Sequence, residues 1–285
     1  MPELPEVQTI VNDLNAAGLS GTTITRAQVF WPRIIATPSA RKFCQQIKGQ
    51  TIHTLWRRAK YLVFDFTGGD HLLIHLRMSG RLHFVSSEVE RAKHEHVILD
   101  FDDHRQLRFH DTRKFGRLYL VSDPETVLGN LGPEPLAKSF TAKLFGERLQ
   151  ARHRRLKPLL LDQTFLAGLG NIYVDEALWE AQLHPCRRAA SLAESEIRAL
   201  HRSIRRVLKR GLNNLGTSLG NGQANFYSIG ERTGNNRGQL NVFQRVRLPC
   251  PRCHTIIERL IVGQRSTHIC PRCQPLKPGS RKSQV

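Results

Sequence analysis

The chain has 285 residues, 40% of them hydrophobic and 24% charged, which indicates a folded protein of one large or two ordinary domains. It has no apolar run near the ~20 residues of a membrane helix and no signal peptide at its start, so we expect a cytoplasmic protein. The net charge of +19 is uneven, with +4 over residues 1–150 and +15 over residues 151–285. Such a field attracts polyanions, and nucleic acid is expected as the partner ahead of an anionic membrane.

The first half of the chain predicts one helix and then several short strands. Apolar residues recur at helical spacing over residues 5–18, and Gly18 is a suitable end. Apolar runs bounded by turn sequences predict strands over residues 61–66, 72–76, 97–101 and 118–121. Short strands of this kind favour a β-sandwich or a barrel.

The periodicity becomes helical after the Gly132-Pro133-Glu134-Pro135 run. Helices are predicted over residues 158–166 and 171–183, and a longer one near 192–210, for which Ser191 and Glu194 have the spacing of a capping box. No acidic residue from 197 to 210 balances the basic face of this last helix. Residues 213–241 are rich in Gly and Asn and predict a long loop.

Two Cys-x2-Cys pairs separated by sixteen residues form the strongest local motif: Cys250, Cys253, Cys270 and Cys273. Two such pairs can complete a tetrahedral site for one zinc ion. Four thiolates leave no open position on the metal, so the expected zinc is structural. Disulfides are the alternative, which a cytosolic setting disfavours. The segment between the pairs predicts a β-hairpin, with Arg265 near its turn.

The start of the chain carries groups suited to amine chemistry. Met1 precedes Pro2, a small residue, so removal of Met1 is expected, and this would expose a secondary amine. An α-amino group with a pKa of about 8 is partly neutral near pH 7 and can attack a carbonyl-like carbon to form a Schiff base. Glu3 lies beside it as an acid or base. The simpler alternative is that Pro and Glu only favour a helix N-terminus.

Six segments with recognisable motifs follow one another along the chain: Pro2-Glu3-Leu4-Pro5-Glu6-Val7, residues 57–62 with Lys60, residues 75–80, residues 111–116, residues 168–173, and the cysteine module with Arg265. In this order they resemble the formamidopyrimidine-DNA glycosylase family, from residue 2 to about residue 274. Each match is short, but the ordered set is specific.

The resemblance implies an α+β, multidomain fold. We expect an N-terminal catalytic β-sandwich with a flanking helix over residues 2–132 and a helix–two-turn–helix DNA-binding domain with a base-capping loop over residues 133–240. A four-cysteine zinc-finger β-hairpin over residues 241–275 and a disordered tail over residues 276–285 would follow. One chain contains every expected part, so a monomer is expected.

The resemblance also implies a base-excision-repair enzyme that removes oxidised purines, such as formamidopyrimidines and 8-oxoguanine, from double-stranded DNA and then cuts the strand. Pro2 would attack the sugar C1′ and displace the base, while Glu3 would donate a proton that helps to open the sugar ring. Lys60 would be the proton donor for β-elimination, and Arg265 would serve δ-elimination. Because the amine is the electron sink, no redox or nucleotide cofactor is expected beside one structural zinc. In the cell, DNA would associate the protein with the nucleoid.

Moving a base out of the DNA stack costs a few kcal/mol, and side chains of the protein should act as a wedge and fill the space that the base leaves. Met78, Arg113 and Phe115 match the family's intercalating residues, although Met and Phe on strands would otherwise be interpreted as core residues. Asn171 could cap the helix that starts there, which would leave backbone N–H groups for phosphate. Further plausible phosphate ligands are His75, His94, Arg152, Lys157 and Arg265.

Two segments depart from the family's pattern. Residues 218–227 lack the Arg-Asp-Tyr run expected after the Ser-Leu pair, and Val242-Phe243-Gln244-Arg245 replaces Val-Tyr-Gly-Arg. These departures concern base selectivity. Two alternatives stay open: a glycosylase of the endonuclease VIII type for oxidised pyrimidines, against which Leu4 argues, and a non-enzymatic, zinc-dependent DNA-binding protein.

Overall fold

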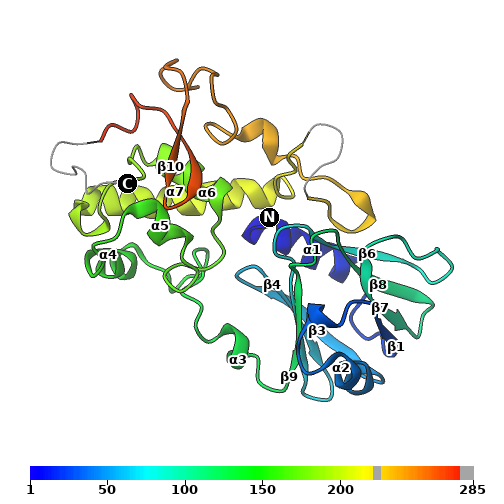
Figure 1. The fold of residues 1–285 in the computed structure, drawn as a ribbon. Coiled ribbons are helices and arrows are strands. Elements are labelled where there is room, and N and C mark those ends of the chain that lie inside the picture. Colours follow the sequence, from blue (N-terminus) through cyan, green and yellow to red (C-terminus); the bar gives the residue numbers. More distant parts are fainter. Residues whose placement is uncertain (221–225, 277–285) are drawn as a thin grey trace. The chain divides into compact units, whose positions relative to one another are not determined.

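The computed structural model describes residues 1–220 and 226–276, which fall into two compact units (Figure 1). The first unit comprises Met1–Asn130 and Gly211–Arg237, and the second comprises Leu131–Arg210 and the chain from Gly238 onward. The segment expected as one domain over residues 133–240 is therefore divided between the units. Among the described helices, none has the length and apolar character needed to cross a bilayer.

The first unit contains two β-sheets that share one core, as the short apolar runs predicted. One sheet has the strand order β1-β7-β8-β6 and the other β2-β9-β5-β4-β3, and only the β2–β9 pair is parallel. All four predicted strands are present, as β4, β5, β7 and β9. The strands are β1 Ile24–Val29, β2 Ile35–Thr37, β3 Ile52–Arg58, β4 Tyr61–Phe66, β5 His71–His75, β6 Gly80–Ser86, β7 Glu95–Phe101, β8 Arg105–Asp111 and β9 Arg117–Val121.

Helices α1 (Leu4–Ala16) and α2 (Ala40–Ile47) cover edges of this core, and α3 (Glu125–Leu128) follows β9. Val7, Ile10, Val11 and Leu14 of the predicted apolar face of α1 are buried, Ala17 is half-buried after the helix end, and α1 contacts β3 and β4. The helix ends before Gly18, whose φ of +71° is a conformation that glycine adopts without a steric penalty. Phe226, from the segment that returns to this unit, joins the same core.

The second unit consists of helices α4 (Ala142–Gln150), α5 (Leu156–Leu161), α6 (Asn171–Glu180) and α7 (Glu194–Asn213), and of a hairpin formed by β10 (Glu258–Val262) and β11 (Arg265–Ile269) (Figure 1). The last three residues of α7 belong to the first unit. The three predicted helices and the hairpin are confirmed. Short 3-10 helices lie at Pro32–Ile34, Ala189–Ser191, Ile229–Glu231 and Asn236–Gln239.

The predicted capping box of α7 is wrong. The hydroxyl of Ser191 donates to the carbonyl of Arg188 at 2.8 Å inside a 3-10 helix. The carboxylate of Glu196, rather than that of Glu194, accepts the backbone N–H of Ala193 at 2.9 Å. The helix therefore starts two residues later than the sequence predicted, and its reach-back carboxylate shifts with it.

The predicted cap at Asn171 is also wrong. Gly170 precedes α6, and no side chain caps the helix. The amide of Asn171 instead donates to the carbonyl of Ser266 on β11, at 2.9 Å. A partner 95 residues away replaces the local one, because β11 packs against α6.

Candidate functional site

The N-terminal residues form a buried corner of the first unit. Pro2 and Glu3 are buried directly before α1. Glu3 and Glu6 form a capping box, in which the backbone N–H of Glu3 donates to Oε2 of Glu6 at 2.8 Å. Glu3 and Glu6 therefore do stabilise the N-terminus of α1, but these bonds leave carboxylate oxygens that can accept further hydrogen bonds.

The second oxygen of Glu6 binds the segment that returns to this unit. Its Oε1 accepts the backbone N–H of Thr217 at 2.6 Å. Gly216, with φ of +84°, lies so close that an added Cβ would come within 2.9 Å of Cγ of Glu6. This approach requires glycine and fixes residues 216–217 beside the chain start.

Four charged side chains act on the amino group at the start of the chain. Burial lowers the pKa of the α-amino group of Met1, and Lys60 and Arg113 act in the same direction, while Glu3 and Glu6 oppose it. The net effect is a lower pKa, which increases the fraction of neutral, nucleophilic amine at neutral pH.

Lys60 reaches this corner from a tight turn between β3 and β4. Arg58 and Tyr61 pair across the turn, and Ala59 takes a positive φ of 52°. The carbonyl of Ala59 accepts from Nη1 of Arg57 at 2.8 Å. The Lys60 side chain is only 4% exposed, so an ammonium lies in the protein next to the proposed nucleophile.

The predicted wedge residues lie on two exposed loops. Met78 is 44% exposed between β5 and β6, and Phe115 is 46% exposed between β8 and β9. The guanidinium of Arg113 lies 4.8 Å from the Phe115 ring centre. Because they are exposed, Met78 and Phe115 are not core residues. Their apolar side chains are accessible to a base stack.

Asp111 joins the two wedge loops and was not identified from the sequence. Its fully buried carboxylate accepts from the Ser79 hydroxyl at 2.5 Å, from the backbone N–H of Arg113 at 3.1 Å and from that of Gly116 at 2.7 Å. One side chain thus holds both loops in a fixed relation. The sequence signal was its place as the first residue of the 111–116 motif.

His75, the last residue of β5, has a neutral imidazole. Burial, with Arg77 and Lys60, lowers its pKa to about 3. Its Nδ1 accepts the backbone N–H of Arg77 at 3.0 Å, so the proton lies on Nε2. His94, with φ of +74°, is half-buried and has ring contacts with His96 and His110.

A cavity of about 450 Å³ lies in the first unit beside these loops. Its lining includes Ser79 and Thr112, the chain neighbours of two wedge residues. The guanidinium of Arg81 lies 4.5 Å from the ring centre of Tyr227, at the end of the predicted base-capping loop. Residues 221–225 of that loop are outside the described residues.

The predicted phosphate ligands of the second unit differ in accessibility. Arg265 is exposed as the first residue of β11, and Arg152 is exposed after α4. Asn171 is partly buried, and its Oδ1 has no hydrogen-bond partner among the described residues. Lys157 is different, since its ammonium is fully buried between Asp175 and the carbonyl of Ser266. The structure therefore does not support a direct phosphate contact for Lys157 in this conformation.

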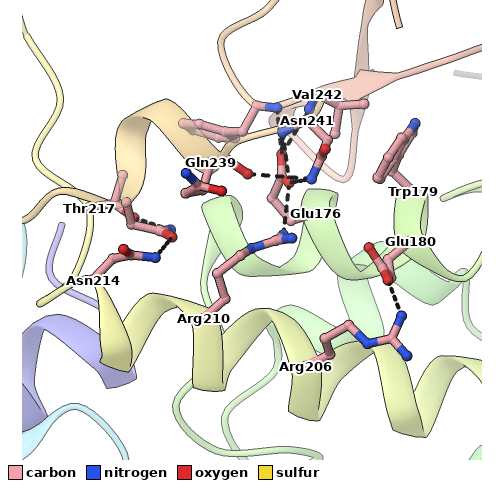
Figure 2. A network of polar contacts seen from close by, with 12 residues as sticks. Glu176, Trp179, Glu180, Arg206, Arg210, Asn214, Thr217, Gln239, Asn241 and Val242 are labelled. Carbon is pink, nitrogen blue, oxygen red and sulfur yellow. Dashed lines mark hydrogen bonds and ion pairs between the residues drawn. The ribbon is translucent and has the colours of Figure 1, made fainter. Parts of the chain in front are cut away.

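Glu176 anchors the segment that leads into the cysteine module (Figure 2). Its buried carboxylate accepts the backbone N–H groups of Asn241, Val242 and Phe243 at 2.9–3.0 Å, and Nη2 of Arg210 lies 3.6 Å away. The Asn241 side chain adds a further bond at 2.9 Å. Sequence reasoning missed Glu176, because the backbone groups that it binds lie 65–67 residues away.

The four cysteines fit a zinc ion. Their sulfur atoms all lie within 4.8 Å of one another, and the separations are 3.9 Å for Cys250–Cys273 and 3.4 Å for Cys253–Cys270 and Cys253–Cys273. A tetrahedral site with Zn–S bonds of about 2.3 Å has S–S edges of about 3.8 Å, whereas a disulfide bond is about 2 Å long. The indole N–H of Trp179 points to the Cys250 sulfur at 3.4 Å, as expected for a thiolate.

Three family models match this chain. The model for the formamidopyrimidine-DNA glycosylase N-terminal domain matches residues 1–118, and that for the formamidopyrimidine-DNA glycosylase H2TH domain matches residues 131–221. A zinc finger found in FPG and IleRS matches residues 247–276.

Relatives match over nearly the whole length. The formamidopyrimidine-DNA glycosylase of Protochlamydia amoebophila is 50% identical over 274 residues, which is 96% of this chain and 99% of that protein. Two Lactococcus lactis FPG structures, one with Fapy-dG containing DNA and one with abasic-site DNA, each have a TM-score of 0.88 and 36% identity. Each match covers 96% of this chain and 100% of theirs.

Proposed function

Because this chain belongs to the formamidopyrimidine-DNA glycosylase family, we propose that Pro2 is the nucleophile with which it removes damaged bases. The protein is a base-excision-repair DNA glycosylase for oxidised purines, acts on DNA with damaged bases and holds a structural zinc ion. Strand cleavage at the resulting abasic site is consistent with the family. A cytoplasmic, nucleoid-associated location fits this activity.

The observation that carries the proposal is the buried corner around the chain start. Removal of Met1 would leave the Pro2 nitrogen where burial, Lys60 and Arg113 already lower the pKa of an amine. The neutral amine attacks C1′, and the base leaves with the bonding electrons. Glu3, which is 2% exposed, donates a proton in this proposal as the sugar ring opens.

Strand cleavage follows from the iminium that this attack creates. Its positive charge acidifies the neighbouring C2′–H, and loss of that proton breaks the C3′–O bond and releases the 3′ phosphate. Lys60, almost fully buried, supplies a proton for this β-elimination. Loss of the C4′ proton then breaks the C5′–O bond in δ-elimination, and Arg265 receives the 5′ phosphate by charge and hydrogen bonding.

The wedge residues would stabilise the duplex once the base has left. Met78 and Phe115 supply apolar surface and Arg113 supplies hydrogen-bond donors, all from loops that Asp111 fixes. Asn171, Arg152, His75 and His94 would hold phosphates. His75 would do so as a neutral donor through Nε2.

Borohydride trapping tests the nucleophile. Wild-type protein should become covalently attached to 8-oxoguanine duplex and to abasic duplex. Pro2→Gly should retain slower trapping through a primary amine. Glu3→Gln should lose base excision by at least about a hundredfold, as expected for removal of a general acid, and should still be trapped on abasic DNA. Asp13→Asn, on the same helix, is the control for the loss of one carboxylate.

Binding without cleavage or trapping by the wild-type protein would contradict the proposal and favour a DNA-binding module. Preferential cleavage at oxidised pyrimidines would instead favour the endonuclease VIII type.

A further inference from the structure

We infer that Asp175 is a positioning residue for Arg265, and that it controls how far strand cleavage proceeds. The inference rests on the proposed function. It concerns the second elimination alone, which follows the steps assigned to Pro2, Glu3 and Lys60.

Asp175 is a fully buried carboxylate on α6 with three partners. Its Oδ1 accepts from Nζ of Lys157 at 2.6 Å. Its Oδ2 accepts the backbone N–H of His268 at 2.9 Å and lies 3.0 Å from Nδ1 of the same residue. Both oxygens are therefore directed at specific groups of α5 and β11.

The same network holds the residue directly after Arg265. The carbonyl of Ser266 accepts from Nζ of Lys157 at 2.8 Å and from Nδ2 of Asn171 at 2.9 Å. Two donors on one carbonyl, together with the His268 contacts, attach β11 to α5 and α6 at its second and fourth residues.

The hairpin turn also lies against α5. Gly263 and Gln264 both have positive φ angles, 57° and 59°, and connect Val262 to Arg265. An added Cβ on Gly263 would come within 2.8 Å of Cγ of Pro158, the neighbour of Lys157. The chain is thus held on both sides of Arg265 in sequence, at Gly263 and at Ser266.

The side chain of Arg265 is left exposed by this arrangement. Within the described part of the chain it has no side-chain partner that would hold it away from a ligand. A fixed backbone with an exposed guanidinium suits a group that must meet one phosphate at one step. If the hairpin shifts, Arg265 loses this geometry, while the residues assigned to the earlier steps belong to the first unit.

Product analysis on a preformed abasic duplex separates this role from the rest of the reaction. The measurement is the ratio of δ- to β-elimination products under single-turnover conditions with full-length, zinc-loaded protein. Arg265→Ala sets the reference for loss of δ-elimination. Asp175→Asn should lower the ratio about tenfold, with total cleavage and borohydride trapping within about twofold of wild type.

Glu180→Gln is the matched control, because it removes one carboxylate from the same helix at a residue that pairs with Arg206 instead. It should keep the wild-type ratio. A wild-type ratio for Asp175→Asn, beside a lowered ratio for Arg265→Ala, would overturn the inference. Loss of trapping in wild-type protein would count against the proposed function instead.

A second variant covers the case in which an unpaired Lys157 unfolds the protein. Lys157→Met combined with Asp175→Leu replaces the buried pair by apolar groups of similar size, which proteins often tolerate. This double variant should bind one zinc per chain and still show the lowered ratio. Zinc binding with a wild-type ratio would overturn the inference.

Discussion

Single buried charges organise the first unit, and each is satisfied by a specific partner. Arg108 and Glu95, both about 3% exposed, form an ion pair at 3.2 Å between β7 and β8. Glu6 accepts two backbone N–H groups, one from Glu3 and one from Thr217, which lies 211 residues after Glu6. His75 takes the opposite course and stays neutral, because burial makes its charged form unfavourable.

The neutral state of His75 predicts a pH dependence of stability. Its pKa of about 3 lies below that of an unfolded histidine, near 6.5, so the unfolded chain binds the proton first. Above about pH 6.5 His75 is neutral in both states and has no effect on this pH dependence. As the pH falls from 6.5 toward 3, only the unfolded state binds the proton, so the free energy of unfolding decreases. At pH 5 the loss is about 2 kcal/mol.

His75→Gln should flatten the dependence of the unfolding free energy on pH between 6.5 and 4, measured by urea denaturation. His53→Gln, at an exposed position, should leave that dependence as it is in the wild type. An unchanged slope in His75→Gln would show that another group causes the acid sensitivity.

The three residues of the proposed wedge come from two loops, and Asp111 bonds to both loops. Asp111→Asn replaces an acceptor oxygen by an N–H donor, which would face Gly116 or Ser79 and displace a loop. We expect excision of 8-oxoguanine from duplex DNA to fall about tenfold in single-turnover assays, with a smaller effect on a preformed abasic site.

Asp103→Asn makes the same charge change in the exposed turn before β8 and is the control for Asp111→Asn. Equal excision rates for Asp111→Asn and wild type would show that the wedge does not depend on this carboxylate.

Helices, strands and the metal site could be predicted from the sequence where the residues that define them lie close together in the chain. Strand 61–66, helix α1 and the cysteine pairs were predicted closely, because apolar periodicity and ligand spacing lie within a few residues. Strand β8 was missed, since Arg108 lies inside the core and its partner Glu95 belongs to another strand. The cap at Asn171 failed because a tertiary partner replaced the local one, whereas Ser191 failed because its hydroxyl bonds within a 3-10 helix before α7. Asp175 could be understood only once β11 lay against α6.

At the scale of the whole molecule, we expect DNA binding to depend on the positive charge of residues 151–285 and on the zinc site within them. Residues 151–285 carry a net charge of +15 and include Arg152, Arg265 and the cysteine module. Cys253→Ser should weaken the zinc site and with it the hairpin that holds Arg265. We expect DNA affinity to fall about tenfold, with the slope of log K against log salt reduced by about one for each lost phosphate contact.

Cys186→Ser, outside the zinc site, should leave both the affinity and the slope unchanged. Wild-type affinity for Cys253→Ser, despite loss of zinc, would separate DNA binding from the cysteine module.

The proposed mechanism requires the chain's own amine to bond to deoxyribose, and peptide mapping of the reduced covalent complex tests this step. Mass spectrometry of the digested adduct should find the sugar fragment on the nitrogen of Pro2, at a terminus that lacks Met1. A retained Met1 in active protein, or an adduct on Lys60, would contradict the account.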